Sequence, residues 1–251
     1  MDIKADVEKR VQWIKHILET TGARGIIYGN SGGKDCTLVG ALCRMATPDV
    51  LGVIMPCQSS ANYGSDRDDA LAAGKRYDIP QVEVDLTAVK EGLVAAIGDE
   101  LAPADAPDGA ERSALININP RLRMTTLYAM GQARGYLVAG TGNACEYTVG
   151  YFTKWGDGAY DFDPIADMTV SEIYAMLRYL DAPSSIIDKV PSAGLYQGQT
   201  DEAELGVTYA DISAYIKGGE LSVCMRRRIA GMEERTAHKR ALPLRYGSDG
   251  K

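Results

Sequence analysis

Short apolar runs alternate with amphipathic stretches through the first part of the chain. Apolar residues recur every three or four positions between Ile3 and Leu18, a spacing that predicts a helix ending at Gly22. Apolar runs next to glycines or polar residues predict strands at 25–30, 50–56, 81–86 and 136–141. The intervening stretches predict helices at 35–46, 65–77, 87–98 and about 121–134.

The order of these elements indicates the fold class. Strands that alternate with helices at this spacing favour an α/β fold, with a doubly wound parallel sheet flanked by helices. The segment 99–112 is rich in Ala, Pro, Asp and Gly, and we expect an exposed loop there. Beyond residue 165 the pattern is helical, with helices predicted at 169–180, 184–189, 208–217 and 220–234. A chain of 251 residues is within reach of one such domain.

Composition and charge narrow the class of partner. A formal net charge of −7 lacks the basic footprint of a DNA- or tRNA-binding enzyme, so we expect no nucleic-acid partner. No stretch is apolar enough to span a bilayer, and the charged start, MDIKADVEKR, is unlike a signal peptide. We therefore expect a cytoplasmic protein with no membrane partner. Five cysteines without a CxxC pair, and two histidines, argue against a zinc site.

A glycine-rich loop, GNSGGKDCT (29–37), lies between the first predicted strand and the helix that follows. Its glycines and serine allow consecutive backbone N–H groups to point into one concavity, next to the positive end of the helix. The spacing excludes a Walker A loop, because Asp35 follows Gly33-Lys34, and it excludes the dinucleotide GxGxxG motif. On its own, the loop favours a phosphate site only modestly over a tight strand–helix turn.

Asp35 lies in the first turn of the predicted helix. An acid there is stabilised by the helix end, yet it repels phosphate unless a cation bridges the two. Mg²⁺ prefers carboxylate and phosphate oxygens, so a shared magnesium ion would resolve the conflict. The plainer alternative is that Asp35 is a first-turn acid beside a tight turn.

The loop resembles the pyrophosphatase loop of the N-type ATP pyrophosphatases, whose members cleave ATP between the α and β phosphates. The blocks that follow are similar to those of ammonia-dependent NAD synthetases, over roughly residues 20–240. They are RLRMTTLYAM (121–130), LVAGTGNACEYTVGYFTKWGDGAYDFDPIADM (137–168), VPSAGLYQGQTDEAELGVTYADI (190–212) and AHKR (237–240). The resemblance implies a Rossmann-like sheet of the adenine nucleotide alpha hydrolase type, with residues 1–251 forming one NAD synthetase domain.

The same resemblance implies a role for each residue that matches the family's motifs. The expected ATP-binding residues are Gly29, Asn30, Ser31, Gly32, Gly33, Lys34, Asp35, Cys36, Thr141 and Ser192. The expected magnesium ligands are Asp35 and Glu146. The expected contacts to deamido-NAD are Arg121, Lys154, Asp161, His238 and Lys239. Asp35, Glu146 and Lys154 are the expected catalytic residues.

The implied reaction activates a carboxylate, because a carboxylate is a poor electrophile without a leaving group. The nicotinate carboxylate of deamido-NAD attacks the α-phosphate of ATP, which gives an adenylate and pyrophosphate, and ammonia then displaces AMP to give NAD. Positioning and electrostatic stabilisation should dominate such steps. At 251 residues we expect no glutaminase domain, so free ammonia or a separate partner supplies the nitrogen. The family also implies a homodimer.

Two positions depart from the family pattern. Cys36 stands where a serine is usual, and a thiol is the weaker hydrogen-bond partner, although Thr37 next to it could compensate. Val170 stands where a lysine that touches ATP is common, and this puts one ATP contact in doubt. Restoring the lysine is expected to lower the Km for ATP if the position faces the nucleotide.

Other interpretations remain open at this point. The chain could be another ATP-pyrophosphatase-type amidotransferase or thiolase, or a nucleotide-binding module with reduced catalysis, and a plain scaffold is a remote alternative. Several site residues also have simpler interpretations, since Glu146 could be a helix-surface acid and Lys154 an ordinary exposed lysine. The segments 99–112, 152–163 and 193–204 are our candidates for loops that become ordered on binding.

Overall fold

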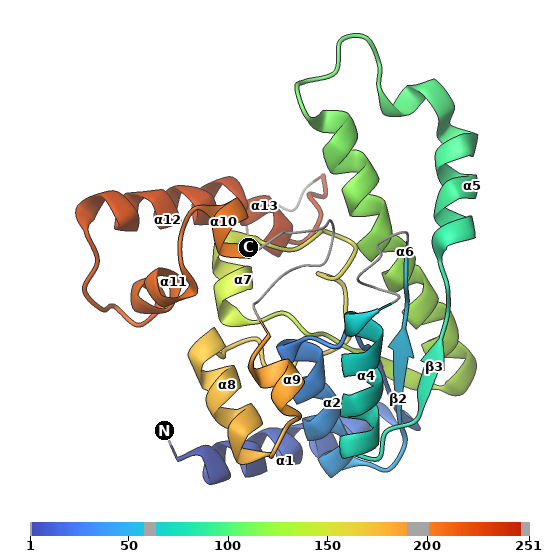
Figure 1. The fold of residues 1–251 in the computed structure, drawn as a ribbon, viewed down its shortest axis with the longest axis vertical. Coiled ribbons are helices and arrows are strands. Elements are labelled where there is room, and N and C mark those ends of the chain that lie inside the picture. Colours follow the sequence, from blue (N-terminus) through green and yellow to red (C-terminus); the bar gives the residue numbers. More distant parts are fainter. Residues whose placement is uncertain (1, 58–63, 190–200, 247–251) are drawn as a thin grey trace.

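A four-stranded parallel sheet forms the centre of the computed structural model, which describes residues 2–57, 64–189 and 201–246 (Figure 1). The strands are β1 (Gly25–Gly29), β2 (Val50–Ile54), β3 (Gln81–Glu83) and β4 (Tyr136–Ala139). Their order is β3-β2-β1-β4, and every neighbouring pair is parallel. The chain therefore moves outward from β1 through β2 to β3 and then returns to the other side of β1. Such a reversal leaves a crevice between β1 and β4, outside their carboxyl ends.

Helices make up most of the remaining chain. In the first half they are α1 (Ile3–Thr21), α2 (Lys34–Ala46), α4 (Ser65–Arg76), α5 (Thr87–Ile97), the 3₁₀ turn η1 (Gly98–Leu101) and α6 (Ala110–Arg134). In the second half they are α7 (Ala144–Val149), α8 (Val170–Tyr179), α9 (Ser184–Ile187), α10 (Asp201–Leu205), α11 (Tyr209–Ile216), α12 (Val223–Arg235) and α13 (Ala237–Arg240). No helix among the described residues is both long and apolar enough to cross a membrane.

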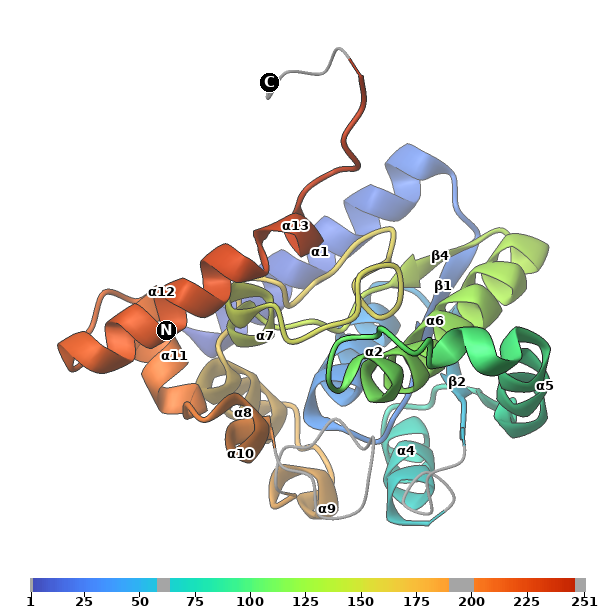
Figure 2. The ribbon, with the colours of Figure 1, turned by 90° about the horizontal axis from the view of Figure 1, so that it is seen from above.

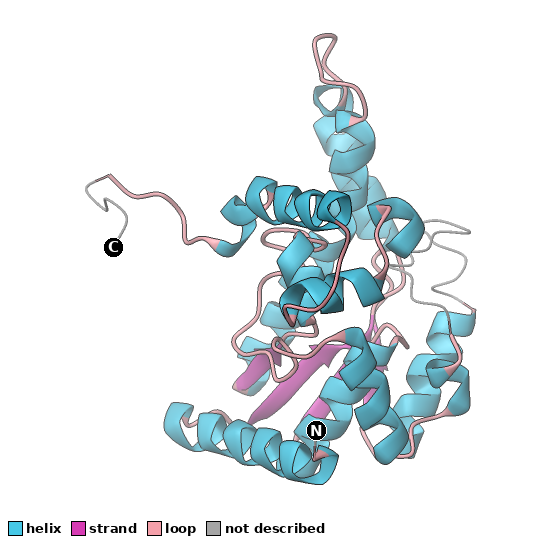
Figure 3. Ribbon diagram, turned by 90° about the vertical axis from the view of Figure 1, so that its left-hand side faces the viewer, coloured by secondary structure: helices cyan, strands magenta, loops and turns pink. Residues whose placement is uncertain are grey.

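Both faces of the sheet are covered, which explains why its strands are apolar without alternation. Ile26 and Tyr28 of β1 pack against α1, α2 and α8 in one core cluster. Ile27, whose side chain points the opposite way, packs with Val138 of β4 and Leu127 of α6 in a second cluster. The two clusters therefore anchor β1 and β4 from both faces of the sheet. Figure 3 shows the strands with helices around them.

A third cluster joins the helices of the second half. Val149 of α7, Val170 of α8, Ile212 of α11 and Ile229 of α12 are all buried in it. This helical part lies beside the sheet and carries α7 to the edge of the crevice (Figure 1). The predicted parallel sheet and the helical second half are therefore both confirmed.

The structure corrects several predicted boundaries. Helix α6 begins at Ala110 rather than near residue 121, so most of the expected loop at 99–112 is a 3₁₀ turn and a short connection. Pro120 lies inside this helix, although proline is more common in the first turn of a helix. The third strand ends at Glu83, and the short helices α7 and α10 were not predicted.

The hairpin made by α5 and the first half of α6 extends away from the sheet (Figure 1). Helix α5 is apolar in sequence, yet it has no buried residue. Val89 is 52% exposed and Leu93 is 37% exposed. All five cysteines are unpaired: Cys36, Cys43, Cys57 and Cys145 are buried, and Cys224 is exposed.

Candidate active site

A pocket of about 690 Å³ opens at the carboxyl ends of β1, β2 and β4. Its walls come from the glycine-rich loop, the segment after β2, helix α6, the loops on either side of α7, and residues of α10 and α13. Figure 2 shows this end of the sheet from above, with α6 on one side of the opening and α7 and α13 on the other. The pocket thus occupies the crevice that the strand order creates.

The glycine-rich loop is fixed in shape from within. The buried Asn30 donates from Nδ2 to the carbonyl oxygen of Ala70 and to Oε1 of Gln81, both at 3.0 Å. Its Oδ1 accepts the backbone N–H of Gly32 at 3.2 Å. Gly32 has φ 75°, and a Cβ there would collide with the backbone of Asp66, so only glycine fits. Gly32 makes the turn without lining the pocket, whereas its neighbours in the loop do line it.

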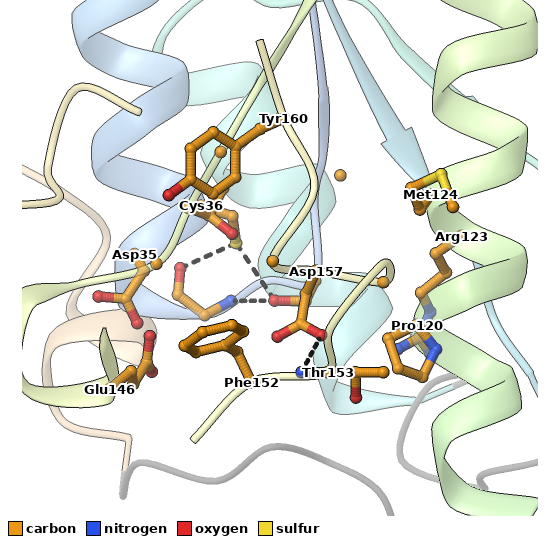
Figure 4. A pocket seen from close by; sticks show the side chains of 18 of the residues that line it. Asp35, Cys36, Pro120, Arg123, Met124, Glu146, Phe152, Thr153, Asp157 and Tyr160 are labelled. Atoms are coloured by element: carbon orange, nitrogen blue, oxygen red, sulfur yellow. Dashed lines mark hydrogen bonds between the residues drawn. The ribbon is translucent and has the colours of Figure 1, made fainter. Parts of the chain in front are cut away.

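Cys36 completes this internal network despite its weaker thiol. Its Sγ lies 3.2 Å from Oγ of Ser31 and 3.2 Å from the carbonyl oxygen of Gly33 (Figure 4). Burial raises the pKa of the Cys36 thiol, which keeps it protonated and able to donate. Thr37 does not compensate for the missing hydroxyl, because its Oγ1 is buried and has no hydrogen-bond partner among the residues that the structure describes.

Two acids face one another across the pocket. Asp35 projects from the first turn of α2 and Glu146 from the first turn of α7, and their carboxylates point toward each other (Figure 4). Burial, together with the charge of Asp35, raises the pKa of Glu146 well above its ordinary value. The two negative charges therefore repel one another and call for a cation between them.

Asn143 holds this pair together. Its side chain caps α7 by accepting the backbone N–H groups of Cys145 and Glu146 at 3.0 and 3.1 Å. The Glu146 carboxylate in turn accepts the backbone N–H of Asn143 at 3.1 Å, which completes a capping box. Nδ2 of the same asparagine donates to Asp35 Oδ1 at 3.3 Å. One fully buried amide thus orients both acids.

Lys34 is the cation that accompanies the acids in this structure. Its Nζ lies 2.6 Å from Oδ2 of Asp35, and its side chain is only 7% exposed. Burial alone would lower the pKa of Lys34, but the charges of Asp35 and Glu146 raise it above its ordinary value. The ammonium group is therefore fully charged at neutral pH.

The donor set fits a magnesium ion. Two carboxylates that face each other beside a phosphate-type loop provide hard oxygen ligands of the kind Mg²⁺ prefers. No group of three or more acidic, histidine or cysteine side chains could hold a metal within the described ranges. The protein would therefore contribute Asp35 and Glu146 and leave the other positions to water and nucleotide oxygens.

Of the residues expected to contact deamido-NAD, one lies in the pocket wall and the others lie outside it. Lys154 donates from Nζ to the carbonyl oxygen of His238 at 2.6 Å, and Arg121 donates from Nε to the carbonyl oxygen of Lys154 at 3.4 Å. Lys239 reaches the carbonyl oxygens of Gly150 and Phe152, both at 2.7 Å. Of the expected set, only Lys239 lines the pocket, and the exposed Arg121 and His238 lie near its edge.

The carboxylate of Asp161 accepts hydrogen bonds from two other elements of the fold. Its Oδ2 accepts the backbone N–H of Val138 at 2.7 Å, and its Oδ1 accepts the hydroxyl of Tyr128 at 3.2 Å. Asp161 therefore links β4 to α6, and each of its carboxylate oxygens already accepts one hydrogen bond. Thr141 lines the pocket as expected, whereas Ser192 and residues 193–200 of the expected flexible segment lie outside the described residues.

Val170 does not face the pocket. It is 6% exposed, packs in the third core cluster, and is not part of the pocket wall. The expectation that a lysine at this position would contact ATP is therefore wrong for this backbone, because its charge would enter an apolar cluster. The valine fits the packing of α8 against α7 and α11.

Sequence reasoning missed several residues that line the pocket or fix its walls. Asn143 could have been found, because Asn followed three residues later by Glu is a capping-box pattern. Arg123, whose Nε donates to the carbonyl oxygen of Met55 at 3.1 Å, lies inside α6 and gave no distinct signal (Figure 4). Asp163 accepts the backbone N–H groups of Gly142 and Ile165, both at 3.0 Å, and so fixes the loop that leads to α7.

A model of the NAD synthase family matches residues 6–243 of the chain. The chain belongs to the NAD synthase family. Among curated relatives, the NH(3)-dependent NAD(+) synthetase of Carboxydothermus hydrogenoformans is 41% identical over 237 residues, which covers 94% of each chain. A relative of the same name from Alkaliphilus metalliredigens is 38% identical over 245 residues, covering 97% of this chain and 98% of the relative.

Solved structures of family members superpose closely on this fold. NMN synthetase from Francisella tularensis has a TM-score of 0.89 at 34% identity, with 98% of each chain covered. The NH3-dependent NAD synthetase of Campylobacter jejuni has a TM-score of 0.79 at 26% identity, covering 98% of this chain and 99% of that one. The fold described above is therefore shared with both of these proteins over nearly their whole length.

Proposed function

We propose that the chain catalyses the ATP-dependent amidation of deamido-NAD with ammonia, through an adenylate, giving NAD, AMP and pyrophosphate. The observation that carries this proposal is the pair of facing acids, Asp35 and Glu146, beside a glycine-rich loop whose N–H groups are preorganised. Family membership and the names of the curated relatives support the same reaction. The proposed reaction changes no oxidation state, so it needs no redox cofactor.

In the first step the pocket brings two negatively charged substrates together. The glycine-rich loop, from Gly29 to Cys36, and Thr141 bind the ATP phosphates. Asp35 and Glu146 would hold Mg²⁺, and the ion would neutralise negative charge on the phosphate oxygens. The nicotinate carboxylate is held in line with the α-phosphate, and preorganised charges lower the barrier without reorganisation.

In the second step ammonia replaces AMP on the activated carbonyl. We assign Arg121, Lys154, His238 and Lys239 to the deamido-NAD side of the pocket, with Lys154 closing on the substrate and Asp161 supporting that wall. Ser192 is assigned to ATP on the resemblance alone. The loop that carries Lys154 is bonded to α13, which carries His238 and Lys239, so the two can act as one unit over the substrate.

The decisive assay combines purified protein, ATP, Mg²⁺, deamido-NAD and ammonium, with detection of NAD, AMP and pyrophosphate. Equal amounts of the three products support the proposal. Production of ADP, or conversion of ATP without an amide product, contradicts it. Omission of ammonium should stop NAD formation, which tests the nitrogen source.

A mononucleotide substrate is the second candidate. The Francisella tularensis protein is called an NMN synthetase, and its structure matches this chain with a higher TM-score and identity than that of the Campylobacter jejuni NAD synthetase. The same chemistry would then amidate nicotinate mononucleotide. Parallel assays with both substrates decide between them, and the larger kcat/KM identifies the physiological reaction.

The remaining expectations are part of the same proposal. We infer a homodimer, supported by helix α5, which is apolar but has no buried residue. We also propose Mg²⁺ as the metal, because the facing carboxylates suit a hard divalent ion. Free ammonia is the proposed nitrogen source. A cytoplasmic location and one domain over residues 1–251 stay predictions from the sequence.

A further inference from the structure

The ammonium group of Lys34 lies where the site most needs positive charge. Its Nζ is 2.6 Å from Asp35 Oδ2, the charge of Glu146 also acts on it, and the ring centroid of Tyr209 lies 5.5 Å away. Lys34 is the first residue of α2, directly after Gly33 of the glycine-rich loop. Its long side chain therefore begins at the phosphate loop and ends at the acids.

A metal ion and this ammonium group cannot both be bound closely by the same two acids. Like charges a few ångströms apart in a partly buried site repel each other strongly. An unneutralised acid pair is also costly to bury, so one cation or the other must accompany it. A lysine side chain with four rotatable carbons can turn away when a stronger cation arrives.

Building on the proposed function, we propose that Lys34 is an exchangeable counter-cation. Its ammonium group and the divalent metal compete for the carboxylates of Asp35 and Glu146. When the metal takes the carboxylates, the displaced ammonium group turns to the phosphates of the bound nucleotide. The residue thus keeps the acids neutralised before binding and adds a phosphate contact afterwards.

The test replaces Lys34 by methionine, which keeps length and removes charge. Titration calorimetry measures Mg²⁺ binding to the protein alone, and then binding of an α,β-methylene ATP analogue with saturating Mg²⁺. Without its competitor, Mg²⁺ alone should bind about tenfold tighter to Lys34→Met than to the wild type. The nucleotide with Mg²⁺ should bind about tenfold weaker, because one charge-assisted phosphate contact is lost.

Opposite shifts in the two titrations are the signature of exchange. Weaker binding of both ligands would mean that Lys34 only supports the loop, and unchanged Mg²⁺ affinity would also overturn the proposal. Lys34→Arg, which keeps the charge, should retain the wild-type Mg²⁺ affinity and covers the case in which Lys34→Met fails to fold. The matched control is Lys217→Met, which removes a lysine paired with Glu172 at 2.8 Å outside the pocket and should shift neither titration.

The experiments can contradict the proposed function and the exchange of Lys34 with the metal independently of each other. If the wild type forms an amide product, AMP and pyrophosphate while Lys34→Met leaves Mg²⁺ affinity unchanged, only the exchange is wrong. If the wild type forms no such products from either nucleotide substrate, the proposed function is wrong, whatever the metal titration shows.

Discussion

At the scale of single residues, Asn143 connects the two acids of the site. It caps α7, which carries Glu146, and its amide donates to Asp35 on α2. These bonds join helices from distant parts of the chain. The geometry of the acid pair therefore depends on one side chain that is not itself a metal ligand.

Replacement of Asn143 by alanine should damage both stability and activity. The loss of a buried cap and of its bonds should reduce the free energy of unfolding by about 1–3 kcal/mol. The kcat should fall by about tenfold or more, because the two acids lose their alignment. Urea denaturation and steady-state kinetics measure the two effects. Asn143→Ser keeps an acceptor for the cap and should recover more stability than activity; equal recovery of both would show that the bond to Asp35 is unimportant.

Asp163 should make stability depend on pH. Burial raises its pKa to about 7, the N–H groups of Gly142 and Ile165 oppose the rise, and the charge of Asp35 adds to it. Because the pKa is higher in the folded than in the unfolded chain, the contribution of Asp163 is fully present below its unfolded pKa of about 4 and is lost as pH rises through about 7. The groups around it are Asp35 and Cys43 on α2, Tyr160 and Asp167.

Thermal melting of the wild type and Asp163→Asn between pH 4 and pH 8 checks this prediction. The variant lacks the titrating group, so its melting temperature should decline less over the interval from about pH 4 to pH 7. Parallel curves for the two proteins would show that the carboxyl group of Asp163 does not titrate in this range.

Residue roles could be read from the sequence only where a local motif carries them. The glycine-rich loop, Asp35 and Glu146 belong to such motifs. Apart from Gly32, the loop from Gly29 to Cys36 lines the pocket, and so does Glu146. Arg123 and Asp163 act through contacts between distant segments, which no local pattern records. The prediction that position 170 faces ATP failed for the same reason. The direction of the Val170 side chain depends on how α8 packs against α7 and α11.

At the scale of elements, α13 and the loop after α7 hold each other. Lys239 binds two carbonyl oxygens of the loop, and Lys154 of the loop binds a carbonyl oxygen of α13. Within the loop, the backbone N–H of Thr153 donates to Asp157 at 2.9 Å (Figure 4). These bonds place the expected substrate cations on one connected unit.

Lys239→Met should loosen this unit. Without the two bonds, amide hydrogen exchange in residues 150–158 should become faster, and the KM for deamido-NAD should rise by about tenfold. Exchange mass spectrometry and initial-rate kinetics provide the measurements. Arg227→Met, on the exposed side of α12, is the control and should change neither quantity. Unchanged exchange in Lys239→Met would show that the loop is held by its own internal bonds.

Element order was predictable because strand and helix periodicities differ, and the parallel sheet follows from their alternation. The start of α6 was not predictable from the sequence. Its first residues continue a segment rich in Ala, Pro, Asp and Gly, a composition that indicates a loop, and its first half extends away from the sheet. Position in the whole fold, rather than local preference, decides where that helix begins.

At the scale of the whole molecule, the α5–α6 hairpin is the surface that we assign to a second copy of the chain. Leu93→Glu places a charge on the exposed apolar face of α5 and should shift the protein from dimer to monomer in size-exclusion chromatography with light scattering. Leu71→Glu on α4 is a matched control, because Leu71 is 38% exposed and Leu93 is 37% exposed. A wild type that is monomeric at micromolar concentration would contradict the assignment.

The distribution of the five thiols gives the protein a built-in reporter of its own unfolding. Cys224 is exposed, whereas the other four are buried, and burial raises the pKa of each of these. A maleimide dye should therefore label the native chain once and rapidly, and the denatured chain five times. Because Cys36 lies under the glycine-rich loop and Cys145 at the start of α7, the order in which they become reactive would show which wall of the pocket opens first.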